Sequence, residues 1–203
     1  GESIGLSNCL NFGNPENPEI MWQFEQAVSG MGEACRVFDI PVVSGNVSLY
    51  NETLSQAIYP TPTVVVVGLL KDRLHHTTQW FKEDEDLIGL IGLTMEEFGG
   101  SEYLNIVCDR VEGHPPQLDL NAAKSVNELC LEFIQKGLLN SAHDCSEGGL
   151  AVALAESCIS HPHSPQGAML NIDSTLRNDA YLFGESQSRI LVSFKAKNRL
   201  AME

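Results

Sequence analysis

Residues 44–48 of this sequence, SGNVS, place oxygen-bearing side chains beside a glycine at the end of a strand-like run. Asn46 and Ser48 lie two positions apart, so an extended backbone puts their side chains on one face. An amide oxygen and a hydroxyl there could coordinate Mg²⁺ and hold a substrate oxygen. The residues alone leave an alternative open, an Asx turn that closes a hairpin toward Tyr50 and Asn51.

The run SAHDCSEGGLAVALAE at residues 141–156 offers a second pattern, a carboxylate followed by glycines and an alanine-rich helical segment. The start of a helix supplies free backbone N–H groups and the positive end of a dipole, which attract anions. Asp144 could bring Mg²⁺ to phosphates held there. The alternative is a capping box, in which Asp144 caps the helix and Glu147 reaches back.

A glycine turn, Gly99-Gly100-Ser101, forms a third pattern because it follows one predicted strand and precedes a helical start. Its backbone N–H groups could cradle a phosphate. It could equally be a tight turn, and the residues do not decide between the two.

The elements that must position these residues alternate between strand and helix. The first 17 residues, dense in Asn, Gly and Pro, predict a loop, and an apolar stripe predicts a helix from about Pro18. Further predicted elements are strands at 63–70, 87–93, 168–172 and 190–194, and helices at 120–139 and 148–160. The alternation indicates an α/β or α+β fold. The acidic run FKEDED at 81–86 suggests two domains, residues 1–80 and 81–203.

Composition argues against several classes of protein. The net charge of −15 disfavours a nucleic-acid surface, and no apolar run indicates a signal peptide or a membrane segment. The six cysteines include no CxxC pair, which argues against zinc and suggests reduced thiols in a cytoplasmic protein. Cys145 follows Asp144, and a neighbouring carboxylate raises a thiol pKa, which disfavours a nucleophile.

Longer motifs point to a family. They are LSNCLNFGNPENPEI and the residues after it as far as position 53, YPTP at 59–62, GGSEY at 99–103, SAHDCSEGG at 141–149 and LFGESQSR at 182–189. Together they resemble phosphoribosylformylglycinamidine synthase, the ATP-dependent amidating enzyme of purine biosynthesis. The resemblance is to the later of two internal repeats in its synthetase subunit or domain. It spans nearly the whole chain, in the family's order.

The resemblance implies a fold like that of aminoimidazole ribonucleotide synthetase, here called PurM-like. A ferredoxin-like N-terminal domain, truncated at its start, would contribute strands to a shared barrel, and an α/β C-terminal domain would follow. The implied enzyme is an ATP-dependent C–N ligase that uses Mg²⁺. ATP phosphorylates the amide oxygen of formylglycinamide ribonucleotide, and glutamine-derived ammonia displaces phosphate from the resulting iminophosphate.

The resemblance also implies roles for individual residues. The family's ATP contacts match Asn8 and Gly45, its Mg²⁺ ligand matches Asn46, and a residue that contacts the ribonucleotide matches Ser48. Asp144 looks like a metal ligand of an auxiliary nucleotide site, related to the reactive site by pseudo-twofold symmetry.

Other functional parts are expected outside this chain. The family's catalytic histidine and ATP-contacting lysine belong to the earlier repeat, and its Cys-His-Glu glutaminase triad belongs to another subunit or domain. The implied partners are therefore the rest of the synthetase chain and a glutaminase. The triplet Glu185-Ser186-Gln187 matches a substrate-contacting motif of the earlier repeat and is expected here to be a symmetry relic. The chain opens within a motif, so we expect an excised piece that is inactive by itself.

Two other interpretations stay open. One is a non-catalytic half, a scaffold and auxiliary nucleotide-binding module that pairs with the first repeat and docks the glutaminase. The other is a different ATP-dependent enzyme of the same fold, similar to selenophosphate synthetase. The second is weakened because the glycine-rich N-terminal loop with a reactive Cys or Sec is not found in this sequence.

Overall fold

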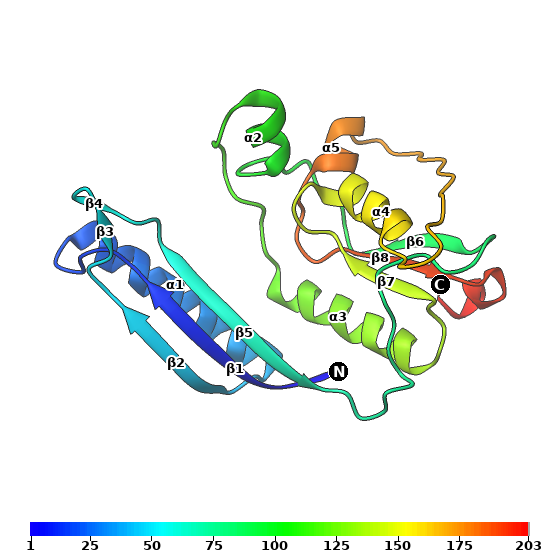
Figure 1. Ribbon diagram of the computed structural model, residues 1–203, viewed down its shortest axis with the longest axis horizontal. Helices are drawn as coiled ribbons and strands as arrows, with labels where there is room; N and C mark the ends of the chain where they lie inside the picture. Colours follow the sequence, from blue (N-terminus) through cyan, green and yellow to red (C-terminus); the bar gives the residue numbers. More distant parts are fainter. Residues whose placement is uncertain (203) are drawn as a thin grey trace. The chain divides into compact units, whose positions relative to one another are not determined.

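The computed structural model describes residues 1–202, which form two compact units, Gly1–Lys71 and the residues from Asp72 onward (Figure 1). Short contacts place the segment after Asp72 in the second unit. The Thr77 hydroxyl donates to the Asn140 carbonyl at 2.7 Å, and the Phe81 N–H donates to the Ser157 carbonyl at 2.9 Å. These compact units do not test the predicted domain extents, 1–80 and 81–203, which stay predictions.

The first unit is a three-stranded sheet with one long helix. The strands are β1 (Glu2–Asn11), β2 (Val42–Ser48) and β5 (Thr61–Leu69), in the order β2-β1-β5. β1 runs parallel to β2 and antiparallel to β5. The helix α1 (Pro18–Phe38) connects β1 to β2, and a short hairpin of β3 (Glu52–Thr53) and β4 (Gln56–Ala57) precedes β5.

The prediction of a loop over the first 17 residues is wrong, because β1 occupies Glu2–Asn11. Leu6 and Leu10 are buried, whereas Ser7, Cys9 and Asn11 are only partly buried. Alternation of this kind is the pattern of a half-buried strand. The dense turn residues that follow β1 hid this signal.

Helix α1 packs on one face of the sheet (Figure 1). Leu10, Phe12 and Ile20 are buried there, and the rings of Phe12 and Phe24 meet edge to face at 5.3 Å. Asn17 caps the helix by accepting from the Glu19 N–H at 3.0 Å. The side chains of Ser7, Cys9 and Asn11, which alternate with those facing α1, therefore point away from the helix.

The second unit is an antiparallel sheet with helices on both faces. The strand order is β6 (Leu87–Ile91), β8 (Ile190–Phe194) and β7 (Ser141–Asp144). The helices are α2 (Glu102–Cys108), α3 (Leu120–Gln135), α4 (Gly149–Ile159) and α5 (Asn178–Phe183), with a 3₁₀ helix over Ala196–Ala201. The predicted strand at 168–172 is wrong. These residues form neither strand nor helix, and Met169 is almost fully exposed.

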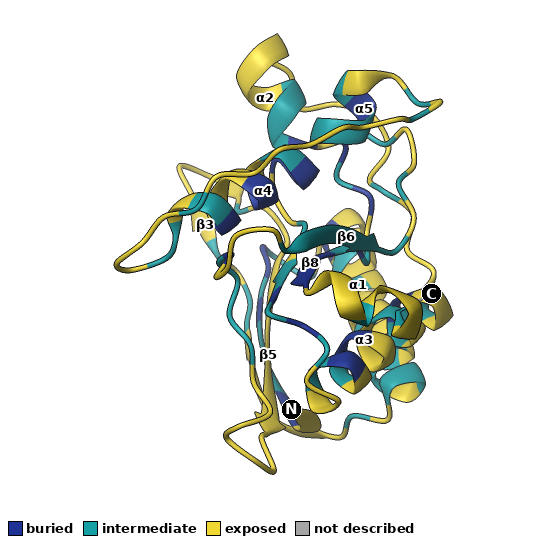
Figure 2. Cartoon of the chain, turned by 90° about the vertical axis from the view of Figure 1, so that its right-hand side faces the viewer, coloured by how far each residue is buried: buried dark blue, intermediate teal, exposed yellow. Residues whose placement is uncertain are grey.

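The core of the second unit lies on both sides of β8, whose residues are among the most buried (dark blue in Figure 2). Leu191 packs with Leu150 and Leu154 of α4. Val192, the next residue, packs with Phe133 of α3. Because neighbouring strand residues point to opposite faces, β8 joins the two layers.

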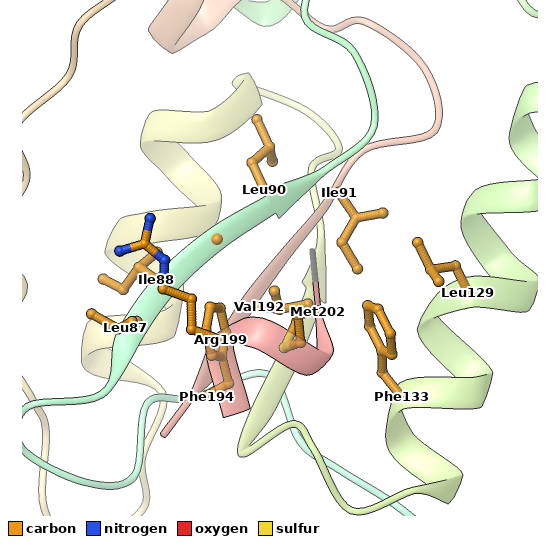
Figure 3. A pocket seen from close by; sticks show the side chains of 11 residues that line it. Leu87, Ile88, Leu90, Ile91, Leu129, Phe133, Val192, Phe194, Arg199 and Met202 are labelled. Carbon is orange, nitrogen blue, oxygen red and sulfur yellow. The ribbon is translucent and has the colours of Figure 1, made fainter. Parts of the chain in front are cut away.

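An apolar cavity of about 500 Å³ lies between β6, β8, α3 and the end of the described chain. Figure 3 shows Leu129 and Phe133 of α3 facing the strands across this cavity. Its charged lining residue is Arg199, and none of the predicted site residues lines it. Among the described residues, no helix is both long and apolar enough to cross a bilayer.

Candidate functional site

The first predicted site lies toward the carboxyl ends of β1 and β2. Asn8 pairs with Gly45, Cys9 with Asn46, and Asn11 with Ser48 in the parallel register. Ligands of open sheets commonly bind beyond the carboxyl ends of parallel strands. Folding therefore brings together the residues that the sequence separates by the whole of α1.

Asn8 and Gly45 are in direct contact. A Cβ atom added at Gly45 would lie 2.8 Å from Asn8 Oδ1 and 3.2 Å from Asn8 Cγ. The Asn8 amide thus lies over the glycine, where any larger side chain would displace it. β2 is exposed from Val42 to Val47 and is an edge strand of the described sheet, so a ligand can approach the Gly45 backbone closely.

Asn46 and Ser48 occupy the other face of the sheet, as their spacing predicts. Cys9 Sγ lies 3.7 Å from Asn46 Oδ1, and the Ser44 and Ser7 hydroxyls are 2.7 Å apart. We call this side the polar face. It comprises Ser7, Cys9, Asn11, Ser44, Asn46 and Ser48, with Thr61 and Thr63 opposite Asn11 and Cys9 on β5. The four predicted residues thus form two pairs on opposite faces, and both pairs can be reached at the free edge of β2.

Ser48 belongs to a hydrogen-bond network that the sequence only hinted at. Asn51 Nδ2 donates to the Ser48 carbonyl at 2.9 Å and to the Phe12 carbonyl at 3.1 Å. The Ser48 hydroxyl lies 3.3 Å from Asn51 Oδ1. The local-turn alternative is therefore partly realised, because Asn51 does fasten the turn after β2. Among the described residues, Asn46 is not a member of this network.

The polar face offers the type of ligand atom that a magnesium ion prefers, but too few ligands to hold the ion alone. Apart from the Cys9 thiol, its groups are amide and hydroxyl oxygens, the hard donors that Mg²⁺ prefers. No carboxylate lies among them. Among the described residues, no three His, Cys, Asp or Glu side chains cluster closely enough to hold a metal. Asn46 could supply one ligand, and phosphates or other chain segments would have to supply the rest.

Asp144 ends β7, where it pairs with Ile190 of β8. Its side chain is 76% exposed, and Oδ2 accepts from the Ser146 hydroxyl at 2.7 Å. This hydrogen bond is the main cause that lowers the pKa of Asp144, against a smaller opposing effect of burial. The neighbouring His143 donates from Nε2 to Glu156 Oε2 at 2.8 Å. Asp144 is therefore an accessible, ionised carboxylate.

The capping-box alternative for Asp144 is wrong. The N-cap of α4 is Gly148, whose φ of 78° is left-handed and which has no side chain of its own to cap the helix. The turn through Ser146 and Glu147 separates Asp144 from the helix. Its carboxylate is thus left free of the helix start, which keeps the proposed metal role open.

Glu185 holds the second unit's glycine motifs together. Its Oε1 atom accepts from the Gly148 N–H at 2.8 Å and from the Glu102 N–H at 2.9 Å. The starts of α2 and α4 therefore share one carboxylate. Sequence reasoning treated the Glu185 triplet as a relic and missed this contact, because its partners lie far away along the chain.

The turn Gly99-Gly100-Ser101 is engaged in internal contacts. Ser101 is buried, and its hydroxyl accepts from the Leu104 N–H at 3.3 Å as the cap of α2. The Gly100 N–H donates to the Glu112 carbonyl at 3.0 Å. A Cβ atom at Gly99 would lie 1.7 Å from the His114 carbonyl oxygen. The tight-turn alternative accounts for these contacts, and the phosphate role stays a prediction.

A polar cavity of about 380 Å³ brings two motifs of the second unit together. Its lining includes Asp144, Glu185, Gln187 and the buried Arg189. Cys145 also lines it, and desolvation raises the pKa of its thiol, with Arg189 opposing and Asp144 assisting. Cys145 is thus a poor nucleophile, but burial rather than the neighbouring carboxylate is the main cause.

Family models match both units. A model described as AIR synthase related protein, N-terminal domain, matches residues 1–70, and the corresponding C-terminal domain matches residues 83–202. The chain belongs to the AIR synthase related family. The predicted fold class is therefore confirmed.

Curated relatives within this family carry one name, phosphoribosylformylglycinamidine synthase subunit PurL. A relative from an Anaeromyxobacter species is 54% identical over 200 residues, which are 95% of this chain and 26% of the relative. One from Caldanaerobacter subterraneus is 50% identical over 190 residues, 94% of this chain and 26% of the relative. The predicted resemblance is confirmed. The chain spans about a quarter of the length of these relatives.

Solved structures share the family fold. T. maritima PurL complexed with FGAR superposes with a TM-score of 0.68 at 16% identity, covering 98% of this chain and 33% of that protein. E. coli HypE, a hydrogenase maturation protein, gives 0.65 at 12% identity, covering 99% of this chain and 61% of that protein. At such low identity, these structures support the fold alone.

Proposed function

We propose that this chain is part of the synthetase subunit of a phosphoribosylformylglycinamidine synthase. The observation that carries the proposal is the 54% identity to a relative of that name over 95% of this chain. The strand ends that bring Asn8, Gly45, Asn46 and Ser48 together support it. The whole protein would convert formylglycinamide ribonucleotide and ammonia to the amidine, with ATP.

In this proposal, the ends of β1 and β2 form one wall of the reactive site. Asn8 and the Gly45 backbone hold ATP, and Ser48 contacts the ribonucleotide. Asn46 offers an amide oxygen to Mg²⁺. A bound Mg²⁺ would offset the negative charge of the transferring phosphoryl group. Such reactions depend on positioning and on charge neutralisation. The chain's own contribution is to orient ATP and the acceptor amide, so that phosphoryl transfer and displacement by ammonia follow.

The second unit has a supporting role in the same proposal. Asp144 is exposed beside a polar cavity of about 380 Å³, which favours a metal ligand of an auxiliary nucleotide site. The rest of the synthetase chain and a glutaminase subunit or domain are the proposed partners, in the cytoplasm. The possible phosphate turn at Gly99-Gly100-Ser101 has the weakest support, because its groups are already bonded within the chain.

The exposed carboxylate Asp144 also favours a second candidate function. The chain could be a scaffold that binds a nucleotide without contributing to the reaction. A different ATP-dependent enzyme of this fold is less well supported, because the curated relatives at 50–54% identity have one name.

Turnover with purified proteins tests the proposed function. The full-length protein that contains this sequence is expected to form the amidine from ATP, Mg²⁺, formylglycinamide ribonucleotide and free ammonia. The chain of 203 residues alone is expected to give no product above a control without protein, because the catalytic histidine is expected elsewhere. Product from the isolated chain would contradict the proposed division of the active site, and none from the full-length protein would contradict the function.

A further inference from the structure

Asn51 ties the carboxyl ends of β1 and β2 to each other. Its side-chain Nδ2 donates to the carbonyls of Phe12, at 3.1 Å, and Ser48, at 2.9 Å. Its backbone N–H also donates to the Phe12 carbonyl at 3.1 Å, and the Phe12 N–H donates to the Ser48 carbonyl at 3.0 Å. The Asn51 amide is therefore held by both strands at the proposed ligand-binding end.

This arrangement determines which way the amide faces. A primary amide has two N–H groups, and both are used by the carbonyls of Phe12 and Ser48. The flipped orientation would place Oδ1 against two acceptors, which the network excludes. Oδ1 is thus the Asn51 atom that can accept, and it lies 3.3 Å from the Ser48 hydroxyl oxygen.

The Ser48 hydroxyl therefore has a fixed polarity. Its proton is donated to Asn51 Oδ1, since Nδ2, although 3.2 Å from the same hydroxyl oxygen, offers no third N–H group. The Ser48 oxygen keeps lone pairs for a ligand, and it is only partly buried. A phosphate oxygen accepts hydrogen bonds and would have to take this proton away from Asn51.

We propose that Asn51 is a positioning residue that sets the Ser48 hydroxyl as a hydrogen-bond acceptor toward the substrate. The inference rests on the proposed function. It implies that Ser48 accepts a hydrogen bond from a donor of the ribonucleotide, either an amide N–H or a ribose hydroxyl. The phosphate of the ribonucleotide does not contact Ser48 in this inference. Specificity at this point would then come from a substrate that has the donor.

A double-mutant cycle in the full-length protein tests the coupling. Ser48→Ala is expected to raise the KM for formylglycinamide ribonucleotide roughly tenfold and to leave the KM for ATP unchanged. Asn51→Ala is expected to raise the same KM about fivefold to tenfold, but to add nothing in the Ser48→Ala background. Asn17→Ala is the matched control. It removes the α1 cap and lowers thermal stability, but should leave both KM values unchanged.

Each outcome separates the inference from the function on which it rests. No effect of Ser48→Ala would overturn the proposed substrate contact, and the role of Asn51 with it. Suppose that Ser48→Ala does raise the KM for the ribonucleotide. If the effect of Asn51→Ala then adds to that of Ser48→Ala, or if Asn51→Ala raises the KM for ATP equally, Asn51 has only a structural role. That result would overturn the inference and leave the proposed function standing.

Inorganic phosphate provides a second test that needs no substitution at Asn51. As a competitor of the ribonucleotide, phosphate is expected to inhibit wild type and Ser48→Ala equally, because Ser48 faces a donor. Inhibition that is roughly tenfold weaker in Ser48→Ala would show that Ser48 donates to the phosphate, and would overturn the proposal.

Discussion

Replacing Arg189 with methionine is expected to lower the free energy of unfolding of the second unit by about 3–5 kcal/mol. The Arg189 side chain is only 1% exposed. Its guanidinium donates to the carbonyls of Ser186 and Gly184 and to the Thr94 hydroxyl. Methionine would leave these buried acceptors unpaired. Glu185 lies between Gly184 and Ser186. Its hydrogen bonds to the Gly148 and Glu102 N–H groups, which connect the starts of α4 and α2, should therefore weaken as well.

Urea unfolding of the chain and its variant measures this loss. Arg110→Met is the control, because Arg110 is exposed and pairs only with Glu112 at the surface, at 3.1 Å in the described structure. Such pairs contribute about 0–1 kcal/mol. Should Arg189→Met unfold within about 1 kcal/mol of wild type, the guanidinium does not hold the loop in the way described.

Gly99→Ala is expected to destabilise the second unit by about 3 kcal/mol or more. The added Cβ atom would lie 1.7 Å from the His114 carbonyl oxygen and 2.5 Å from its carbon. Both are backbone atoms, so relief requires movement of the chain rather than a change of rotamer. Gly99 is thus required for close packing of two segments.

Gly100→Ala provides the matched comparison. Nothing lies within 4 Å of a Cβ atom added there, but the φ of 71° is left-handed. Alanine in that conformation costs roughly 1–2 kcal/mol. Thermal unfolding of both variants gives the comparison. If both variants lose the same small amount of stability, and Gly99→Ala also binds nucleotide more weakly, the phosphate role of this turn would be favoured instead.

Strand periodicity made one part of the first site predictable from sequence. Asn46 and Ser48 share the polar face, as two residues of one strand must. The sequence did not reveal that Asn8 lies beside Gly45 on the opposite face. That relation depends on the register between β1 and β2, and β1 itself was hidden by the turn-forming residues after it.

The second unit shows where reasoning from local sequence fails. Asp144 and Glu147 have the spacing of a capping box, but the left-handed Gly148 starts the helix beyond them. Glu185 serves the start of α4 instead, from 37 residues away, and the start of α2 from 83 residues away. Contacts over such separations follow from the fold and have no signature in residue spacing.

Turnover of the Asn46→Ala variant across a Mg²⁺ titration is the most direct test of the central claim, that the ends of β1 and β2 hold ATP, Mg²⁺ and substrate. In the full-length protein, kcat/KM for ATP should fall roughly tenfold to a hundredfold, as expected for one lost contact to a charged group. Asp144→Asn, at the proposed auxiliary site, should keep most of the turnover. Wild-type kinetics in Asn46→Ala at every Mg²⁺ concentration, or a collapse only in Asp144→Asn, would contradict the account.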